Sequence, residues 1–167
     1  FKAFPVDLTF DLNGAPVLSA GFIGTVDLDP GPGTQIFTSG GPYNACLLKL
    51  DNNGNFIWAK QFAGNSFCDA VAVTCDQTGN ILITGNYNGS IDFDPGAGTA
   101  NFYQGGSVFT AGFVCKLDSN GNYLWARNFS SIAMGGTDIV TDRTGNVYFT
   151  GSFADSVDFD PGPGEFY

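Results

Sequence analysis

The chain has 167 residues, of which 43% are hydrophobic, 15% aromatic and 13% charged, a composition that excludes intrinsic disorder because disordered chains have few aromatic residues and a high charge density. Sixteen acidic residues against six basic ones give a formal net charge of −10, which argues against partners that need clustered Lys or Arg, namely nucleic acid and anionic membranes. The chain contains no histidine, so it lacks the commonest general base and the commonest ligand of zinc and copper.

Three sequence signals recur in a fixed order and indicate an internal repeat. A D-x-x-G turn followed by a hydrophobic run begins at Asp11, Asp76 and Asp142. A D-x-D-P-G-x-G loop follows, over Asp27 to Gly33, Asp92 to Gly98 and Asp158 to Gly164. The third signal is a second turn that leads into a tryptophan-containing segment, over Leu50 to Trp58 and Leu117 to Trp125. Successive copies of these signals are 65 to 67 residues apart. We therefore predict repeat 1 over about 1–65, repeat 2 over about 66–131 and an incomplete repeat 3 over about 132–167.

Each repeat is predicted to contain four short antiparallel strands and no helix. In the second repeat these strands cover 70–75, 80–86, 112–117 and 123–129, where β-branched and aromatic residues lie between D-x-x-G turns. Glycine and asparagine in the turns tolerate the positive φ that tight hairpins demand. This pattern is typical of an all-β fold made of β-propeller blades, of which the chain holds about two and a half. A blade cannot bury both of its faces alone, so neighbouring blades must stack.

The order of these motifs resembles a bacterial β-propeller repeat family found in secreted and surface proteins. The resemblance rests on Asp76 to Asn80, Thr84-Gly85, Asp92 to Pro95, Lys116 to Asp118 and Trp125, and it extends over essentially the whole chain. The D-x-D-P-G-x-G loop looks like those of large secreted proteins from Bacteroidetes-like bacteria, many of which are exported by a type IX system. The resemblance implies an extracellular or cell-surface location. Members of this family commonly have no assigned activity.

The D-x-D-P-G-x-G loops are the candidate metal sites. Aspartates at i and i+2 place both carboxylates on one side of an extended segment, and Ca²⁺ takes six to eight oxygen ligands of this kind. The candidate ligands are Asp27, Asp29, Asp92, Asp94, Asp158 and Asp160. In the alternative interpretation one aspartate caps the turn, the other is a solvated charge, and Pro-Gly sets the turn type. Both interpretations remain open from the sequence.

Trp58 and Trp125 occupy matching positions on the last predicted strand of their repeats. Aromatic residues at such positions are expected to pack between blades; at an exposed rim they would stack on sugars or protein partners. The four cysteines, Cys46, Cys68, Cys75 and Cys115, show no C-x-x-C spacing and are expected to be buried thiols, with disulfides between repeats as the alternative.

No catalytic signature appears in the sequence. The chain has no G-x-S-x-G elbow, no phosphate-binding glycine loop and, lacking histidine, no Ser-His-Asp set. We therefore expect a non-catalytic propeller module with a structural, adhesive or protein-binding scaffold role, its loops stabilised by Ca²⁺. The alternative is a carbohydrate-binding or glycan-processing propeller. The expected partners are a protein, a surface glycan, further blades of a longer chain or a second copy of this chain.

Overall fold

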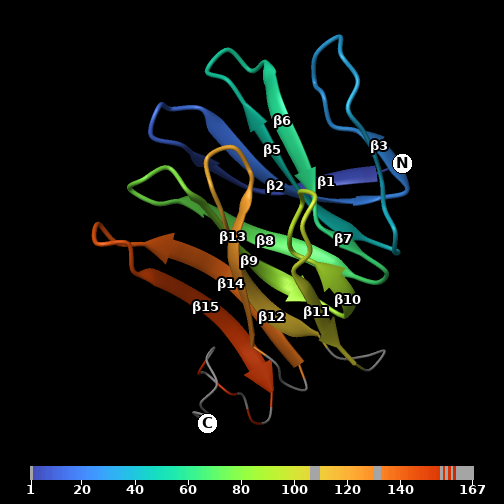
Figure 1. The fold of residues 1–167 in the computed structure, drawn as a ribbon, viewed down its shortest axis with the longest axis vertical. Helices are drawn as coiled ribbons and strands as arrows, with labels where there is room; N and C mark the ends of the chain where they lie inside the picture. The colour runs from blue at the N-terminus through green and yellow to red at the C-terminus, as the bar shows by residue number, and fades with distance from the viewer. Residues whose placement is uncertain are drawn as a thin grey trace.

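The computed structural model describes residues 2–105, 110–129 and 133–154, together with residues 156, 158 and 160. The strands of this part are arranged as three successive blades in a fan (Figure 1). The predicted all-β fold of propeller blades is therefore confirmed. No helix in the described part of the chain is long and apolar enough to cross a membrane.

The first two blades are four-stranded antiparallel sheets with the same strand order. Blade 1 is the sheet β1-β2-β5-β6, made of β1 (Lys2–Phe10), β2 (Pro16–Ile23), β5 (Asn44–Leu50) and β6 (Phe56–Gln61). Blade 2 is the sheet β8-β9-β12-β13, made of β8 (Cys68–Cys75), β9 (Ile81–Tyr87), β12 (Ala111–Leu117) and β13 (Tyr123–Phe129). Of blade 3 the structure describes the hairpin of β14 (Ala133–Thr141) and β15 (Val147–Ala154).

The long connection between the second and third strands of a blade forms a hairpin of its own, which the sequence did not predict. In blade 1 it consists of β3 (Thr25–Asp27) and β4 (Ile36–Thr38), and in blade 2 of β10 (Gly89–Asp92) and β11 (Asn101–Gln104). These two hairpins, called the insert hairpins below, carry the D-x-D-P-G-x-G loops. The insert hairpin of blade 2 gains a third strand, because β10 also pairs with β7 (Ala63–Gly64), which follows the last strand of blade 1.

Every strand alternates its side chains between two faces. The forward face of a blade is the face turned toward the following blade in the chain, and the rear face is turned toward the preceding one. Val17 and Leu47 lie on the forward face of blade 1 and share one buried cluster with Ile83 and Phe113 on the rear face of blade 2. Between blades 2 and 3, Leu82 and other forward-face residues of blade 2 bury Ile139 in the same manner.

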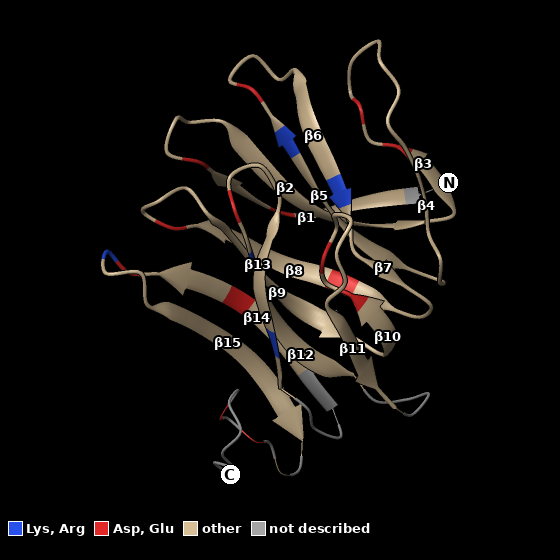
Figure 2. Ribbon diagram, viewed as in Figure 1, with Lys and Arg blue, Asp and Glu red and all other residues tan. Residues whose placement is uncertain are grey.

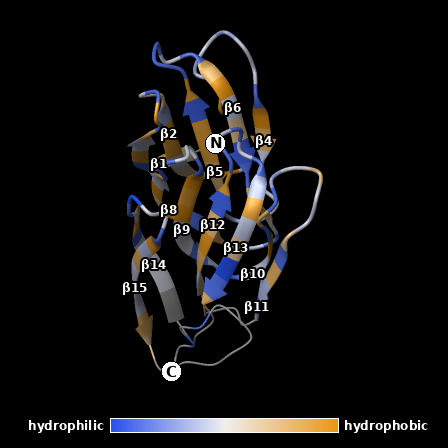
Figure 3. Ribbon diagram, turned by 60° about the vertical axis from the view of Figure 1, so that its left-hand side comes forward, coloured by the Kyte–Doolittle hydropathy of each residue, from blue (hydrophilic) through white to orange (hydrophobic). Residues whose placement is uncertain are grey.

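The insert hairpin of blade 2 extends this core. Phe93 is fully buried, with ring centroids 4.6 Å from Phe113 and 6.2 Å from Phe62 of blade 1. Phe102 packs edge-on against Phe93 at 5.3 Å. The central strands of blade 2, β9 and β12, are buried along almost their whole length. Many strand residues are hydrophobic, whereas the turns are largely hydrophilic (Figure 3).

Candidate functional site

The first aspartate of each D-x-D-P-G-x-G loop caps the loop through its side chain. Oδ1 of Asp92 accepts hydrogen bonds from the backbone N–H groups of Asp94 (3.0 Å) and Ala100 (2.8 Å). Asp27 accepts the matching bonds from Asp29 and Gln35 at 3.0 and 2.8 Å. One carboxylate oxygen therefore ties the start of each loop to its end, eight residues later.

The second aspartate closes the Pro-Gly turn. Oδ1 of Asp94 accepts a hydrogen bond from Gly96 N–H at 2.8 Å, and Asp29 accepts the equivalent bond from Gly31 at 2.7 Å. Oδ2 of Asp94 occupies the space in which a Cβ of residue 98 would lie, so only glycine fits there. The second glycine of the motif is thus required by the approach of this carboxylate, whereas a Cβ at the first, Gly96, would lie 3.0 Å from Oδ1 of Asp94 and be only tightly accommodated.

The third loop lies only partly within the described residues. Asp160 N–H donates to Oδ1 of Asp158 at 2.9 Å, which repeats the first bond of the other two loops. Residues 159 and 161–164 of this motif lie outside the described residues.

The geometry places the six predicted metal ligands in three separate loops, two in each. Their Oδ1 atoms accept backbone amides in the two fully described loops, a bonding pattern that belongs to turn capping. Among the described residues, no three acidic or cysteine side chains gather closely enough to hold a metal ion. A bound Ca²⁺ would therefore need the remaining Oδ2 atoms together with backbone carbonyls or water. Calcium binding stays a prediction for these loops.

A second set of aspartates caps the opposite end of the blades, where the D-x-x-G turns lie. In all five such turns Oδ1 of the aspartate accepts the backbone N–H groups two and four residues later, at 2.8 to 3.0 Å. These aspartates are Asp11, Asp51, Asp76, Asp118 and Asp142. The glycine of each turn has a positive φ, between 76° and 87°. Much of the acidic charge therefore lies at turns, whereas the strands are mostly uncharged (Figure 2).

Two lysines to which the sequence analysis assigned no role bind two of these turns. Lys49 Nζ lies 2.8 Å from Oδ2 of Asp11, and Lys116 Nζ lies 2.8 Å from Oδ2 of Asp76. All four side chains are largely buried. Lys49 also donates to the carbonyl of Ser119 in blade 2 at 3.3 Å, so it links two blades. The signal in the sequence was the Lys-Leu-Asp tripeptide at 49–51, repeated at 116–118.

The ion pair changes the titration of Asp76. Burial alone would raise the pKa of this carboxyl group, but the hydrogen bonds from Lys116, Thr78 and Asn80 outweigh burial and lower the pKa below its usual value. The pKa of Asp11 is lowered in the same way. Burial raises this pKa, and the hydrogen bond from Lys49 is the largest of the effects that lower it.

A groove lies at this turn end, between blades 1 and 2. Its volume is about 640 Å³, and its walls include Trp58, the Lys49–Asp11 pair, and the side chains of Asn53 and Asn120.

Trp58 packs against the core between blades 1 and 2, and Trp125 packs against the core between blades 2 and 3. The prediction that these tryptophans pack between blades is thereby confirmed.

The cysteines are free thiols, as predicted, and Cys46, Cys68 and Cys115 are buried. Burial raises the pKa of Cys46 to about 12 and that of Cys75 to about 11. Such thiols remain protonated and unreactive near neutral pH.

The chain matches no protein-family model. It is 32% identical over 126 residues to an uncharacterized WD repeat-containing protein of Acanthamoeba polyphaga mimivirus, an alignment that covers 65% of this chain and 9% of that protein. The chain thus spans less than a tenth of this relative. The similarity supports a propeller-type repeat. The resemblance to the bacterial secreted family stays a prediction.

We expect Gly98→Ala to destabilise the protein by about 1–3 kcal/mol, because the new Cβ would overlap the Asp94 carboxylate and displace it from its turn. Gly105→Ala is the matched control, since the nearest atom to its Cβ would be Tyr103 Cε1 at an ordinary 3.4 Å. Urea unfolding of the two variants measures the difference. Equal free energies of unfolding would contradict this account of the motif.

We expect Asp76→Asn to cost about 2 kcal/mol near neutral pH, because Lys116 loses its charged partner. A lowered carboxyl pKa stabilises the folded state above the unfolded-state pKa, and this stability is lost as the pH falls toward the folded-state value. The difference between wild type and variant is therefore largest above about pH 5 and shrinks below about pH 4. Chemical unfolding from pH 7 to pH 2.5 checks the trend. Asp118→Asn is the control, since among the described residues Asp118 makes no ion pair and its pKa is lowered mainly by hydrogen bonds from Asn122, with a smaller contribution from the charge of Lys60. A difference that does not change with pH would contradict the ion-pair account.

Proposed function

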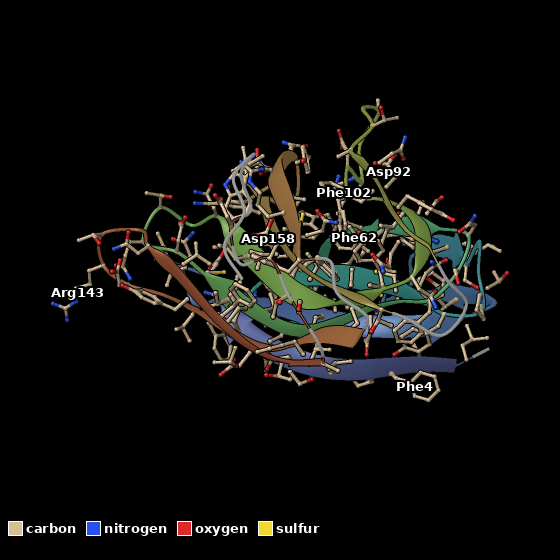
Figure 4. The ribbon with its side chains drawn as sticks, turned by 90° about the horizontal axis from the view of Figure 1, so that it is seen from below. Phe4, Phe62, Asp92, Phe102, Arg143 and Asp158 are labelled. Atoms are coloured by element: carbon tan, nitrogen blue, oxygen red, sulfur yellow. The ribbon has the colours of Figure 1, made fainter. Side chains whose placement is uncertain are left out.

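We propose that this chain forms part of a non-catalytic β-propeller that acts outside the cell as a protein-binding scaffold. The observation that carries the proposal is the pair of insert hairpins, which repeat on successive blades and are held rigid by the same carboxylate–amide bonds. In Figure 4 the hairpin of Asp92 projects beyond the strands, with Phe102 and Phe62 beneath it and Phe4 on the other side of the molecule. Rigid, regularly spaced projections suit the recognition of a partner because little entropy is lost on binding.

The insert hairpins combine exposed apolar residues with acidic ones. Tyr103 is 70% exposed and Ile36 is 55% exposed, and both lie on the second strand of their hairpin. A groove of about 490 Å³ lies between the two blades beside these hairpins, with a mostly apolar lining that also includes the polar residues Gln61, Asn65 and Asp92. An aromatic residue within an acidic, polar surface suits a basic protein partner. The relative's WD repeats support a propeller scaffold, and the lack of a catalytic motif in the sequence supports a non-catalytic role.

A glycan is the second candidate ligand, favoured by the groove at the turn end. Trp58 offers an aromatic surface there, and Asn13, Asn53 and Asn120 offer amide groups that donate and accept hydrogen bonds. The two candidates therefore use opposite ends of the blades, which makes them separable by substitution.

Selection of a random-peptide display library on the immobilised chain tests the first candidate. We expect enrichment of peptides rich in Lys, Arg and aromatic residues, and about a fivefold or greater loss of their binding in Tyr103→Ala/Ile36→Ala. Ile57→Ala, an exposed residue of the turn-end groove, is the control. A glycan array probed in parallel would contradict the scaffold proposal if it gave selective binding that Asn53→Ala abolished and Tyr103→Ala left intact.

Calcium binding by the insert hairpins is proposed as an added source of rigidity, and two substitutions of Asp92 separate it from turn capping. Asn retains the oxygen that accepts the two amides, whereas Ala removes it. If Ca²⁺ binds the loop carboxylates, wild type melts several degrees higher in excess Ca²⁺ than in EDTA, and Asp92→Asn loses part of that shift. Asp92→Ala loses about 1 kcal/mol in both buffers because the cap is gone. Identical melting temperatures of the wild type in the two buffers would overturn the calcium proposal and leave capping as the role of these residues.

A further inference from the structure

The insert hairpin of blade 2 ends in an open sheet edge. Its strands are ordered β11-β10-β7, and among the described residues no strand pairs with the free side of β11. Phe93 N–H donates to the carbonyl of Ala100 at 3.0 Å. Because bonded pairs alternate along antiparallel strands, Phe102 also bonds within the hairpin, whereas the backbone N–H and C=O groups of Asn101 and Tyr103 point to the open edge.

Blade 1 shows that this edge stays open when the following blade is in place. β4 corresponds to β11, with Ile36 and Thr38 in the positions of Asn101 and Tyr103. The insert hairpin of the following blade pairs through β10 with β7 and not with β4. Gln61 Nε2 donates to the Thr38 carbonyl at 3.0 Å and so occupies part of the β4 edge. No side chain of the described residues bonds the corresponding carbonyl of Tyr103.

The edge at β11 also lacks the features that usually prevent an edge strand from pairing with another chain. Such features are charged side chains, prolines and β-bulges. The outer strand of the same blade, β13, has one of them, because Arg127 Nη1 donates to the carbonyl of Ala126 at 2.8 Å. The four residues of β11 are Asn-Phe-Tyr-Gln, and they pair with β10 without a bulge. This short edge can therefore accept a further strand.

The surface beside this edge favours a basic partner. Asp92 lies opposite Asn101 on β10, and both backbone amides that it binds donate to Oδ1, so Oδ2 retains its capacity to bind a cation. Among the described residues that line the neighbouring groove, Asp92 is the one charged side chain. A strand added to β11 would run two strand spacings, roughly 10 Å, from the backbone of Asp92. An extended lysine or arginine side chain spans that distance to the carboxylate.

We propose that β11 binds an extended basic segment of the partner protein as a further strand of the insert sheet. The backbone groups of Asn101 and Tyr103 provide the main-chain hydrogen bonds, as in other cases of strand addition to a sheet edge. Basic side chains on alternate residues of the segment lie on the face of Asp92. This inference rests on the basic protein partner proposed above and specifies how that partner binds.

Three peptides of equal charge test the binding mode. The first is an octapeptide of alternating lysine and threonine with both ends capped. The other two carry N-methyl groups on every lysine nitrogen or on every threonine nitrogen. Because successive N–H groups of an extended chain point to opposite sides, only one methylated set faces β11. We expect fluorescence anisotropy to show about tenfold weaker binding for one methylated peptide and about equal binding for the other two. Attraction to the net charge of −10 cannot separate the three peptides.

Two substitutions of one residue locate the site on the protein. Asn101→Pro removes the N–H that points to the open edge, a change that edge strands tolerate, and it should weaken binding of the unmethylated peptide by about tenfold. Asn101→Ala is the matched control, because it removes the same side chain and keeps the N–H. In the wild type, saturating peptide should slow hydrogen exchange of the Tyr103 amide about fivefold or more. The Phe102 amide, bonded within the hairpin, should change little.

Equal binding of the two methylated peptides, or unchanged Tyr103 exchange in saturating peptide, would overturn the proposal. If the display library still yields basic peptides in that case, the proposed partner class stands and only the mode of binding is wrong. If the library yields none, the proposed function fails as well. Dimerisation of the chain that Asn101→Pro abolishes and Asn101→Ala does not would also overturn the proposal, in favour of a second copy as the occupant of this edge.

Discussion

The structure depends on the fact that each four-stranded sheet is apolar on both faces. One such sheet alone in water would leave both apolar faces exposed, so a blade is stable only when neighbouring blades cover it. Both contacts between neighbouring blades in the described part of the chain are of one kind: the forward face of one blade packs against the rear face of the next. Leu47 and Phe62 meet the aromatic cluster around Phe93 in this way. The insert hairpin strengthens the same contact, because β10 reaches back to β7 of the preceding blade.

Most of the acidic residues lie at turns, where their side chains accept hydrogen bonds from backbone amides. Each hairpin has backbone amides without a strand partner, and an aspartate oxygen satisfies them at both ends of the blades. The five D-x-x-G turns and the insert loops together account for most of the acidic residues in the described part of the chain. The strongly acidic composition therefore arises here from the repetition of one local feature, an aspartate that caps a turn. An acidic surface is the consequence.

Much of this architecture follows from the sequence because it is local. The D-x-x-G turns and the alternation of the strands predict the four-stranded blade, and their period predicts the stacking. The sequence pattern did not predict the insert hairpin, because the short strand Gly89–Asp92 has only one apolar side chain, Ile91, and depends on pairing with Ala63 and Gly64, far along the chain. It also left the roles of Lys49 and Lys116 unassigned. The local sequence around a strand lysine does not indicate which aspartate it will pair with, because that aspartate lies on a turn 38 to 40 residues away.

The two ends of the blades are therefore stabilised in different ways. At the turn end, Lys49 binds both Asp11 of its own blade and a carbonyl of the next blade, so the charge network fixes how neighbouring blades are aligned. Substitutions there change stability before they change recognition. At the other end, the insert hairpins hold their own shape through internal hydrogen bonds, and their exposed residues, such as Tyr103, contribute little to the core. Variation at those exposed positions can alter binding without unfolding a blade, which is the property that a recognition surface on a repeat protein requires.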